Sequence, residues 1–129
     1  MFKRLAAVGL AIGILLTVSI YAQKSTEVFI PIGESPGLSG KYSVIGEIRS
    51  FDCANQILTI RGEDGEHRAR VTDKTKIWLD SSEIKKTNVE GSTADCQAGR
   101  RCEIKYVYDG ANRTEDAEWI KIRVSESGD

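Results

Sequence analysis

Apolar and polar residues alternate along two neighbouring stretches of the chain, residues 42–49 and 57–62, with a short polar segment between them. An alternation with a period of two is typical of a β-strand that buries one face. The segment between them contains Asp52 and Asn55, whose side chains bond nearby backbone groups and favour turns. The pattern predicts a β-hairpin over Tyr42–Gly62, on which the rest of the chain assembles.

The charged positions of this hairpin decide which face is buried. The alternative register would place Glu47, Arg49 and Arg61 inside, and burying unpaired charges costs far more free energy than it gains. A glycine inside the first strand, Gly46, is typical of a bulge or a sharp bend. The core residues expected from the hairpin are Val44, Ile48, Leu58 and Ile60.

Four further stretches alternate in the same way, at residues 67–71, 76–79, 102–108 and 118–124. One helix of a turn or two is expected after Asp80. Five or six short strands with one short helix predict an all-β protein, a small closed or partly open OB-like barrel. A β-sandwich is the alternative, although the strands are too few for the immunoglobulin-like form. The inward residues expected of these strands are Ala69, Val71, Ile77, Leu79, Ile104, Tyr106, Ile120, Ile122 and Val124.

The first 22 residues have a different character. Lys3 and Arg4 precede an uncharged run of 18 residues, Leu5–Ala22. This is typical of a cleaved secretory signal peptide over residues 1–22. The run is close to the ~20 residues that span a bilayer, so an uncleaved residue 5–22 segment that anchors the protein in the inner membrane is the alternative. Either way we expect an exported domain, periplasmic or secreted.

Residues 23–41 form a separate N-terminal arm, followed by the barrel domain at 42–124 and a frayed tail at 125–129. The arm contains a short apolar run interrupted by a proline, and then a glycine-rich loop. It is expected either to lie across the barrel or to dock on a partner protein of the cell envelope. The apolar residues of the run are Val28, Phe29, Ile30 and Ile32.

Charge and rare residues narrow the functional classes. Without Lys3 and Arg4 the chain carries 16 basic against 19 acidic side chains, a net charge of −3, which disfavours nucleic acid as a partner. The single histidine, His67, lacks the neighbours that a triad or a metal site requires. The sequence therefore predicts no catalytic residues, no metal, no cofactor, and a non-catalytic interaction module of the envelope.

The outward positions of several strands collect basic and aromatic residues. OB-like barrels bind oligosaccharides and oligonucleotides on this part of the barrel, and arginines beside aromatic rings suit polyanions. The alternative hypothesis is therefore a module for an anionic glycan or another polyanion, unless glutamates neutralise the stripe and the arm covers the tryptophans. The candidate ligand-binding residues are Arg61, Arg68, Arg70, Lys76, Trp78, Trp119, Lys121 and Arg123.

The three cysteines are an odd number in a chain expected to meet oxidising conditions. Proximity favours a disulfide between Cys96 and Cys102, while barrel topology could instead bring Cys53 to either of them. The third possibility is that they are free thiols that pack as small hydrophobic groups.

Glycine and apolar positions recur at set spacings along residues 42–124. They are Gly46-x-Ile48, Leu58-Thr59-Ile60, Val71-x(3)-Thr75-x-Ile77, Gly99-x(2)-Cys102-x-Ile104 and Ala117-x(2)-Ile120. This pattern resembles a family of small exported bacterial β-barrel (OB-like) domains of unknown function. The resemblance implies the barrel and carries no chemistry, and at Cys96 and Cys102 the chain has cysteines where such domains place apolar residues.

Overall fold

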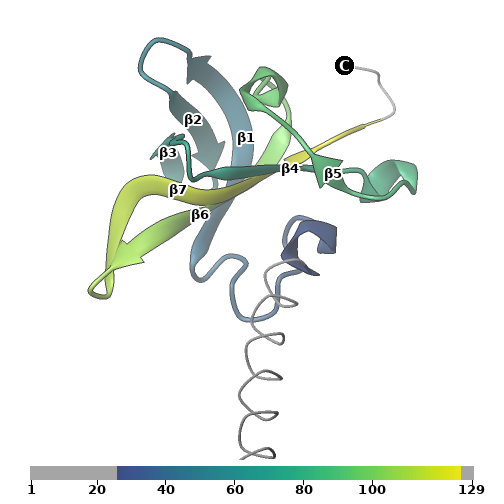
Figure 1. The fold of residues 1–129 in the computed structure, drawn as a ribbon, viewed down its shortest axis with the longest axis horizontal. Coiled ribbons are helices and arrows are strands. Elements are labelled where there is room, and N and C mark those ends of the chain that lie inside the picture. The colour runs from purple at the N-terminus through teal and green to yellow at the C-terminus, as the bar shows by residue number, and fades with distance from the viewer. Residues whose placement is uncertain (1–25, 126–129) are drawn as a thin grey trace, which may run out of the picture.

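The computed structural model describes residues 26–125, which form a curved sheet closed on itself (Figure 1). The sheet order is β3-β2-β1-β6-β7-β4-β5. Three short 3₁₀ turns, η1 (Glu27–Phe29), η2 (Ser82–Ile84) and η3 (Thr93–Asp95), complete the fold. The strands are β1 (Ser43–Asp52), β2 (Ile57–Gly62), β3 (Gly65–Arg70), β4 (Lys76–Asp80), β5 (Val89–Glu90), β6 (Arg101–Asp109) and β7 (Asn112–Arg123).

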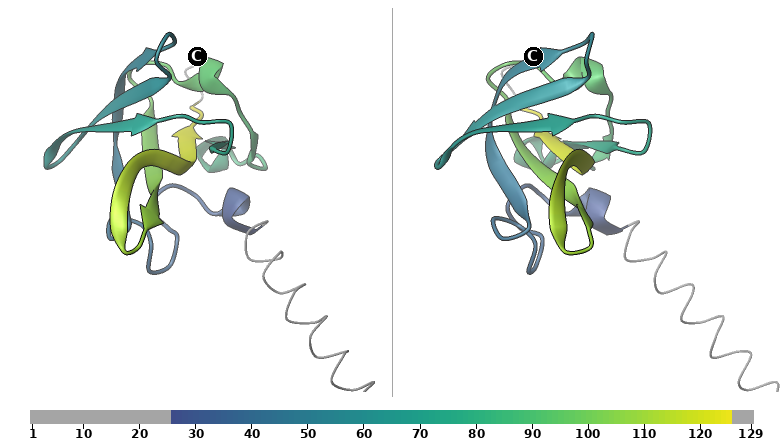
Figure 2. Two further views of the ribbon diagram at one scale, coloured as in Figure 1. Left: turned by 60° about the vertical axis from the view of Figure 1, so that its left-hand side comes forward. Right: turned by 90° about the vertical axis from the view of Figure 1, so that its left-hand side faces the viewer.

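Two sets of pairings turn the sheet into a barrel. On one side β1 pairs antiparallel with β6, and on the other β3 meets β7 in parallel at Arg70 and Asp116. Beyond that contact β4 continues parallel to β7, with Ile77 opposite Ile120. Figure 2 shows the strands curving round a common interior. The all-β, OB-like barrel expected from the sequence is confirmed.

The β1–β2 hairpin forms as its sequence predicts. Asp52 closes the turn, because its Oδ1 accepts hydrogen bonds from the N–H groups of Ala54 (3.0 Å) and Asn55 (3.2 Å). The bulge expected at Gly46 lies instead between Ile48 and Ser50, where the register of β1 against β2 shifts. Gly46 has a different role: a Cβ there would lie 2.4 Å from the carbonyl oxygen of Arg61. Only glycine allows the two strands to approach so closely.

The core contains the inward positions that the alternation predicts. Val44 and Leu79 are partly buried and pack against it, whereas Val124 follows the end of β7 and is partly exposed. The one polar atom of Tyr106 is satisfied, since its hydroxyl donates to the carbonyl oxygen of Arg68 at 2.7 Å. The buried residues at predicted positions are Ile48, Leu58, Ile60, Ala69, Val71, Ile77, Ile104, Tyr106, Ile120 and Ile122.

Two elements differ from the predicted ones. β7 begins at Asn112 rather than near residue 118, because β6 and β7 continue past the core as a ribbon, with Asp109 opposite Asn112. Its first residues are polar and mostly exposed, so no alternation marks them. β5 is a two-residue strand paired with β4, too short to produce a pattern.

The disulfide predicted between Cys96 and Cys102 is not formed, and the structure holds all three cysteines as free thiols. Cys102 is fully buried among core residues of β6, and Cys96 is 7% exposed. Both pack as small apolar groups, while Cys53 is exposed in the β1–β2 turn.

The predicted signal peptide over residues 1–22, its alternative as an anchor, and residues 126–129 of the tail lie outside the described residues. Within residues 26–125, no helix has the length and apolar character needed to cross a bilayer.

Candidate functional site: a groove beside the N-terminal arm

Residues 26–41, the described part of the N-terminal arm, pass along the outside of the barrel and are held there by backbone hydrogen bonds to buried carboxylates. The N–H of Ile32 donates to Asp80 Oδ2 at 2.9 Å, and the N–H of Gly33 donates to Glu103 Oε1 at 3.1 Å. Glu103 also accepts from the hydroxyl of Ser43 at 2.5 Å. These bonds fix the arm in one position, because each needs a specific donor at a specific place.

Lys121 adds a buried cation to this contact. Its side chain is 1% exposed, and its Nζ donates to Glu27 Oε1 at 2.8 Å and to Ser35 Oγ at 3.1 Å. The hydroxyl of Ser35 also donates to Glu27. The ammonium lies 4.4 Å from the ring centre of Trp119, a cation–π contact. Because Glu27 and Ser35 belong to the arm, their bonds to Lys121 fix the arm and the buried ammonium group relative to each other.

Asp80, which binds the N–H of Ile32, has a pKa below the usual value for an aspartate. Burial raises its pKa, but hydrogen bonds from Ser82 and from the N–H of Ile32, together with nearby Arg123, outweigh burial and hold the pKa below its usual value. Asp80 is therefore ionised at neutral pH. Asn88 also binds the arm, because its side-chain amide donates to the carbonyl oxygen of Val28 at 3.0 Å. We call the residues that fix the arm the polar cluster: Glu27, Ser35, Ser43, Asp80, Asn88, Glu103 and Lys121.

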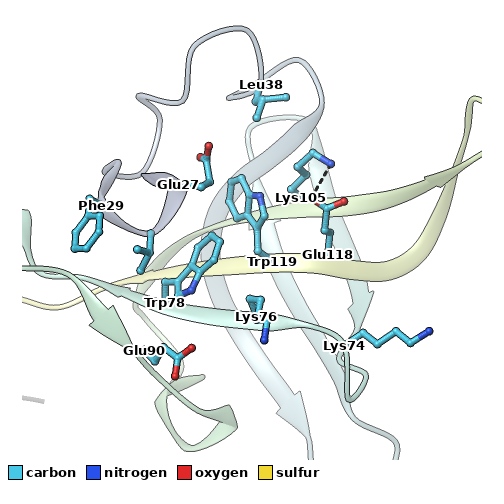
Figure 3. A pocket seen from close by; sticks show the side chains of 11 residues that line it. Glu27, Phe29, Leu38, Lys74, Lys76, Trp78, Glu90, Lys105, Glu118 and Trp119 are labelled. Carbon is cyan, nitrogen blue, oxygen red and sulfur yellow. Dashed lines mark ion pairs between the residues drawn. The ribbon is translucent and has the colours of Figure 1, made fainter. Parts of the chain in front are cut away.

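Between the arm and the strands β4, β6 and β7 the surface is hollowed into a groove of about 840 Å³, called here the aromatic groove (Figure 3). The arm supplies one wall and the strands supply the floor. The lining residues are Glu27, Val28, Phe29, Leu38, Lys74, Lys76, Trp78, Glu90, Lys105, Glu118 and Trp119.

Two tryptophans form the centre of the floor. The ring centres of Trp78 and Trp119 lie 5.8 Å apart with their planes inclined by 33°. Trp119 is 4% exposed, Trp78 is only partly buried, and Phe29 on the arm is 58% exposed. The groove thus offers the surfaces of Trp78 and Phe29 to an incoming ligand, while the ring of Trp119 is held by packing.

Ion pairs neutralise part of the charge around the groove. Lys105 pairs with Glu118 at 3.2 Å, and Glu27 pairs with buried Lys121. Three other charged side chains of the lining form no ion pair with any residue in the described range: Lys74, Lys76 and Glu90.

The predicted basic and aromatic stripe does not form one surface. Lys121 is buried beneath the arm and is not available to a ligand. Arg70 lies 3.2 Å from Asp116 and 3.8 Å from Glu115, and Arg123 lies 3.6 Å from Glu83 and 3.9 Å from Asp80. Lys76, Trp78 and Trp119 belong to the aromatic groove, whereas Arg61 and Arg68 are exposed on β2 and β3. The arm removes Lys121 from the stripe, because Glu27 and Ser35 of the arm bind its ammonium group.

The apolar run of the arm is also divided. Ile32 is 5% exposed and turned toward the barrel, Val28 and Ile30 are partly buried, and Phe29 is exposed. Sequence reasoning missed the polar cluster and the groove residues Leu38, Lys74, Lys105 and Glu118. One signal was present, because Glu103 and Lys121 carry opposite charges and each lies between two apolar residues of its strand. In the structure Glu103 and Lys121 are direct neighbours across β6 and β7.

His67 has one carboxylate partner. Its Nε2 lies 2.7 Å from Asp64 Oδ1, three residues earlier, and this contact holds the pKa of Asp64 below its usual value. Asp64 is 75% exposed in the β2–β3 turn, so the pair stabilises a turn. Among residues 26–125, no group of three or more histidine, cysteine, aspartate or glutamate side chains is placed to hold a metal ion.

No protein-family model matches the chain, and no curated protein matches it. Two solved structures are similar to it. A tryptophan-to-alanine variant of CusF from Escherichia coli with Cu(II) shares 16% identity and a TM-score of 0.41, covering 63% of this chain and 89% of that one. The Ag(I) form of CusF shares 16% identity and a TM-score of 0.39, covering 62% and 93%. The copper and silver are ligands of CusF.

Proposed function

We propose that this chain is an exported, non-catalytic β-barrel module that binds a protein partner of the cell envelope through the aromatic groove. One observation carries the proposal: Trp78 on β4 and Phe29 on the arm present aromatic surface in one groove, and hydrogen bonds to Asp80 and Glu103 fix the arm in position. Aromatic side chains are enriched at protein interfaces and dominate their binding energy. Export rests on the signal-like residues 1–22.

The test is co-purification of the tagged protein from envelope extracts. We expect the wild-type protein to retain a partner that Trp78→Ala and Phe29→Ala lose. Removing a central aromatic side chain from an interface typically costs ~2 kcal/mol or more, about a thirtyfold weaker complex. Arg68→Ala, which truncates an exposed side chain on β3, is the matched control and should retain the partner. A partner retained equally by all variants, at equal thermal stability, would remove the groove from the proposal.

The second candidate, binding of an anionic glycan or another polyanion, has less support. Ion pairs occupy Arg70 and Arg123, and burial removes Lys121. Retention on an immobilised polyanion should therefore be weak and should change little in Arg61→Glu or Arg68→Glu. Strong retention that falls with salt and is lost in these variants would favour this candidate.

A further inference from the structure

We infer that the aromatic groove takes an extended peptide segment in which an acidic side chain lies near an apolar one, so that the carboxylate meets Lys74 and Lys76 while the apolar group covers Trp78. This deepens the proposed function and rests on it. The inference names the chemistry of the partner segment, which neither the fold nor the similar structures give.

The charges that remain after internal pairing determine the polarity of the occupant. Glu27 and Glu118 lie in the groove but are already satisfied by Lys121 and Lys105. Three charged side chains of the lining have no ion pair within residues 26–125, Lys74, Lys76 and Glu90, and because two of them are lysines the charge that remains is positive. A carboxylate placed there would form charge-assisted hydrogen bonds, which are roughly twice as strong as neutral ones.

Lys74 is held on a rigid turn. The hydroxyl of Thr75 donates to the carbonyl oxygen of Ala117 at 2.7 Å, and the same oxygen atom of Thr75 accepts from the N–H of Thr72 at 2.9 Å. The N–H of Lys74 itself donates to Thr72 Oγ1 at 3.2 Å. The backbone of the turn is thus tied to β7, so less conformational entropy is lost when a ligand binds at its lysine.

The two ends of the groove differ. Figure 3 shows Phe29 at one end and Lys74 at the other, with Trp78, Glu90 and Lys76 between them. An extended strand places alternate side chains on one face about 6.6 Å apart, which suits an apolar side chain on the tryptophans followed by an acid at the lysines. The volume of about 840 Å³ lies within the range that is usual for ligand sites.

The chain provides its own probe for the test. Its only two tryptophans, Trp78 and Trp119, both line the groove, so intrinsic tryptophan fluorescence reports on this site alone. The experiment titrates the protein purified from its native compartment with the blocked peptide acetyl-Ala-Leu-Ala-Glu-Ala-amide. Two counterparts carry glutamine or lysine in place of the glutamate.

We expect the glutamate peptide to change the fluorescence and to bind about tenfold more tightly than the glutamine peptide, with the lysine peptide weakest. Lys74→Gln combined with Lys76→Gln should abolish the preference while still binding the apolar group. Lys86→Gln, which changes an exposed lysine outside the groove, should keep the preference. Thermal unfolding of each variant confirms that it is folded.

Several results would overturn the inference. They are equal binding of the glutamate and glutamine peptides, binding of none at millimolar concentration, and a preference that survives the double lysine variant. A response only to vesicles of phosphatidylglycerol and phosphatidylcholine would assign the groove to a membrane surface, and one that depends only on protein concentration would assign it to a second copy. Either outcome overturns the peptide. Capture of a partner that requires Trp78 but shows no acidic preference would remove this inference and leave the proposed function intact.

Discussion

The interior of the barrel and the surface beneath the arm lie on the same strands, yet their chemistry is opposite. On β6 the neighbouring residues Ile104 and Glu103 point to the two sides of the sheet, and on β7 Ile120 and Lys121 do the same. All four are at most 1% exposed. Inside the barrel apolar side chains pack on one another. Beneath the arm, each buried charge has its own hydrogen-bond partners.

The difference separates folding from positioning. Apolar burial is non-directional and follows the area removed from water, so it favours the barrel without choosing one position for the arm. Hydrogen bonds to Glu103, Asp80 and Lys121 are directional and allow only one position. Since the arm forms one wall of the aromatic groove, the polar cluster determines the shape of the proposed binding site.

The largest expected loss of stability comes from a substitution in the interior of the barrel. Ile104→Ala leaves a cavity in the core and should lower the free energy of unfolding by ~2–5 kcal/mol. Urea denaturation, followed by the intrinsic fluorescence of Trp78 and Trp119, measures this loss. The unfolding should remain cooperative, because the arm and the barrel lose their structure together. A loss below ~1 kcal/mol would contradict the assignment of Ile104 to the core.

A substitution in the polar cluster beneath the arm should cost less stability and should affect mainly the arm. Lys121→Met keeps the bulk of the side chain but leaves Glu27 and Ser35 without their partner, which should cost ~1–3 kcal/mol. Hydrogen exchange should quicken at the amides of residues 26–42 while the barrel strands keep their protection.

Lys105→Met makes the same chemical change at an ion pair whose partner, Glu118, is half exposed. This pair joins β6 to β7 and includes no residue of the arm, so the control should change exchange in the arm hardly at all. Equal effects from the two lysine variants would show that the buried position of Lys121 does not matter.

The same difference explains what the sequence could predict. Alternation finds strands that bury one face, and it predicted β1 to β4, β6 and the core part of β7. It fails for the exposed ribbon at the start of β7 and for β5, where neither face is buried. It also assigned Lys121 and Trp119 to the outer surface, because alternation reports which side of the sheet a residue occupies and not what covers that side.

The candidate site was only partly visible for the same reason. Trp78, Trp119 and Lys76 were predicted as binding residues, and the structure brings them together in one groove. Their neighbours on the arm, Glu27, Val28, Phe29 and Leu38, are distant in sequence. Their meeting depends on the hydrogen bonds of the polar cluster, which no periodic pattern encodes.

Acid should weaken the arm contact before it affects the apolar core. The folded-state pKa of Asp80 is held below its ordinary value of 3.8, so its contribution to stability is complete above that value and is lost as the pH falls through the lower folded-state pKa. The free energy of unfolding of the wild-type protein should fall as the pH drops below about 4. In Asp80→Asn this fall should be shallower, with lower stability at neutral pH. Parallel pH profiles for the two proteins would contradict this role of Asp80.

The smallest effect on stability should come from the cysteines, which test whether the interior is as apolar as it looks. Burial, with smaller contributions from Asp95 and Cys53, raises the pKa of the Cys96 thiol to about 11, and burial raises that of Cys102 as well. At pH 8 only about one thousandth of Cys96 would then be thiolate, the form that reacts.

A thiol reagent applied to the unreduced protein should label exposed Cys53 quickly and the other two cysteines only after unfolding. Cys53→Ser should leave the free energy of unfolding within ~0.5 kcal/mol of the wild type. Mass mapping that found a disulfide between Cys96 and Cys102 in protein from the native compartment would contradict the free thiols of the interior. Rapid labelling of Cys102 in the folded protein would show that the barrel opens where its packing is expected to be tightest.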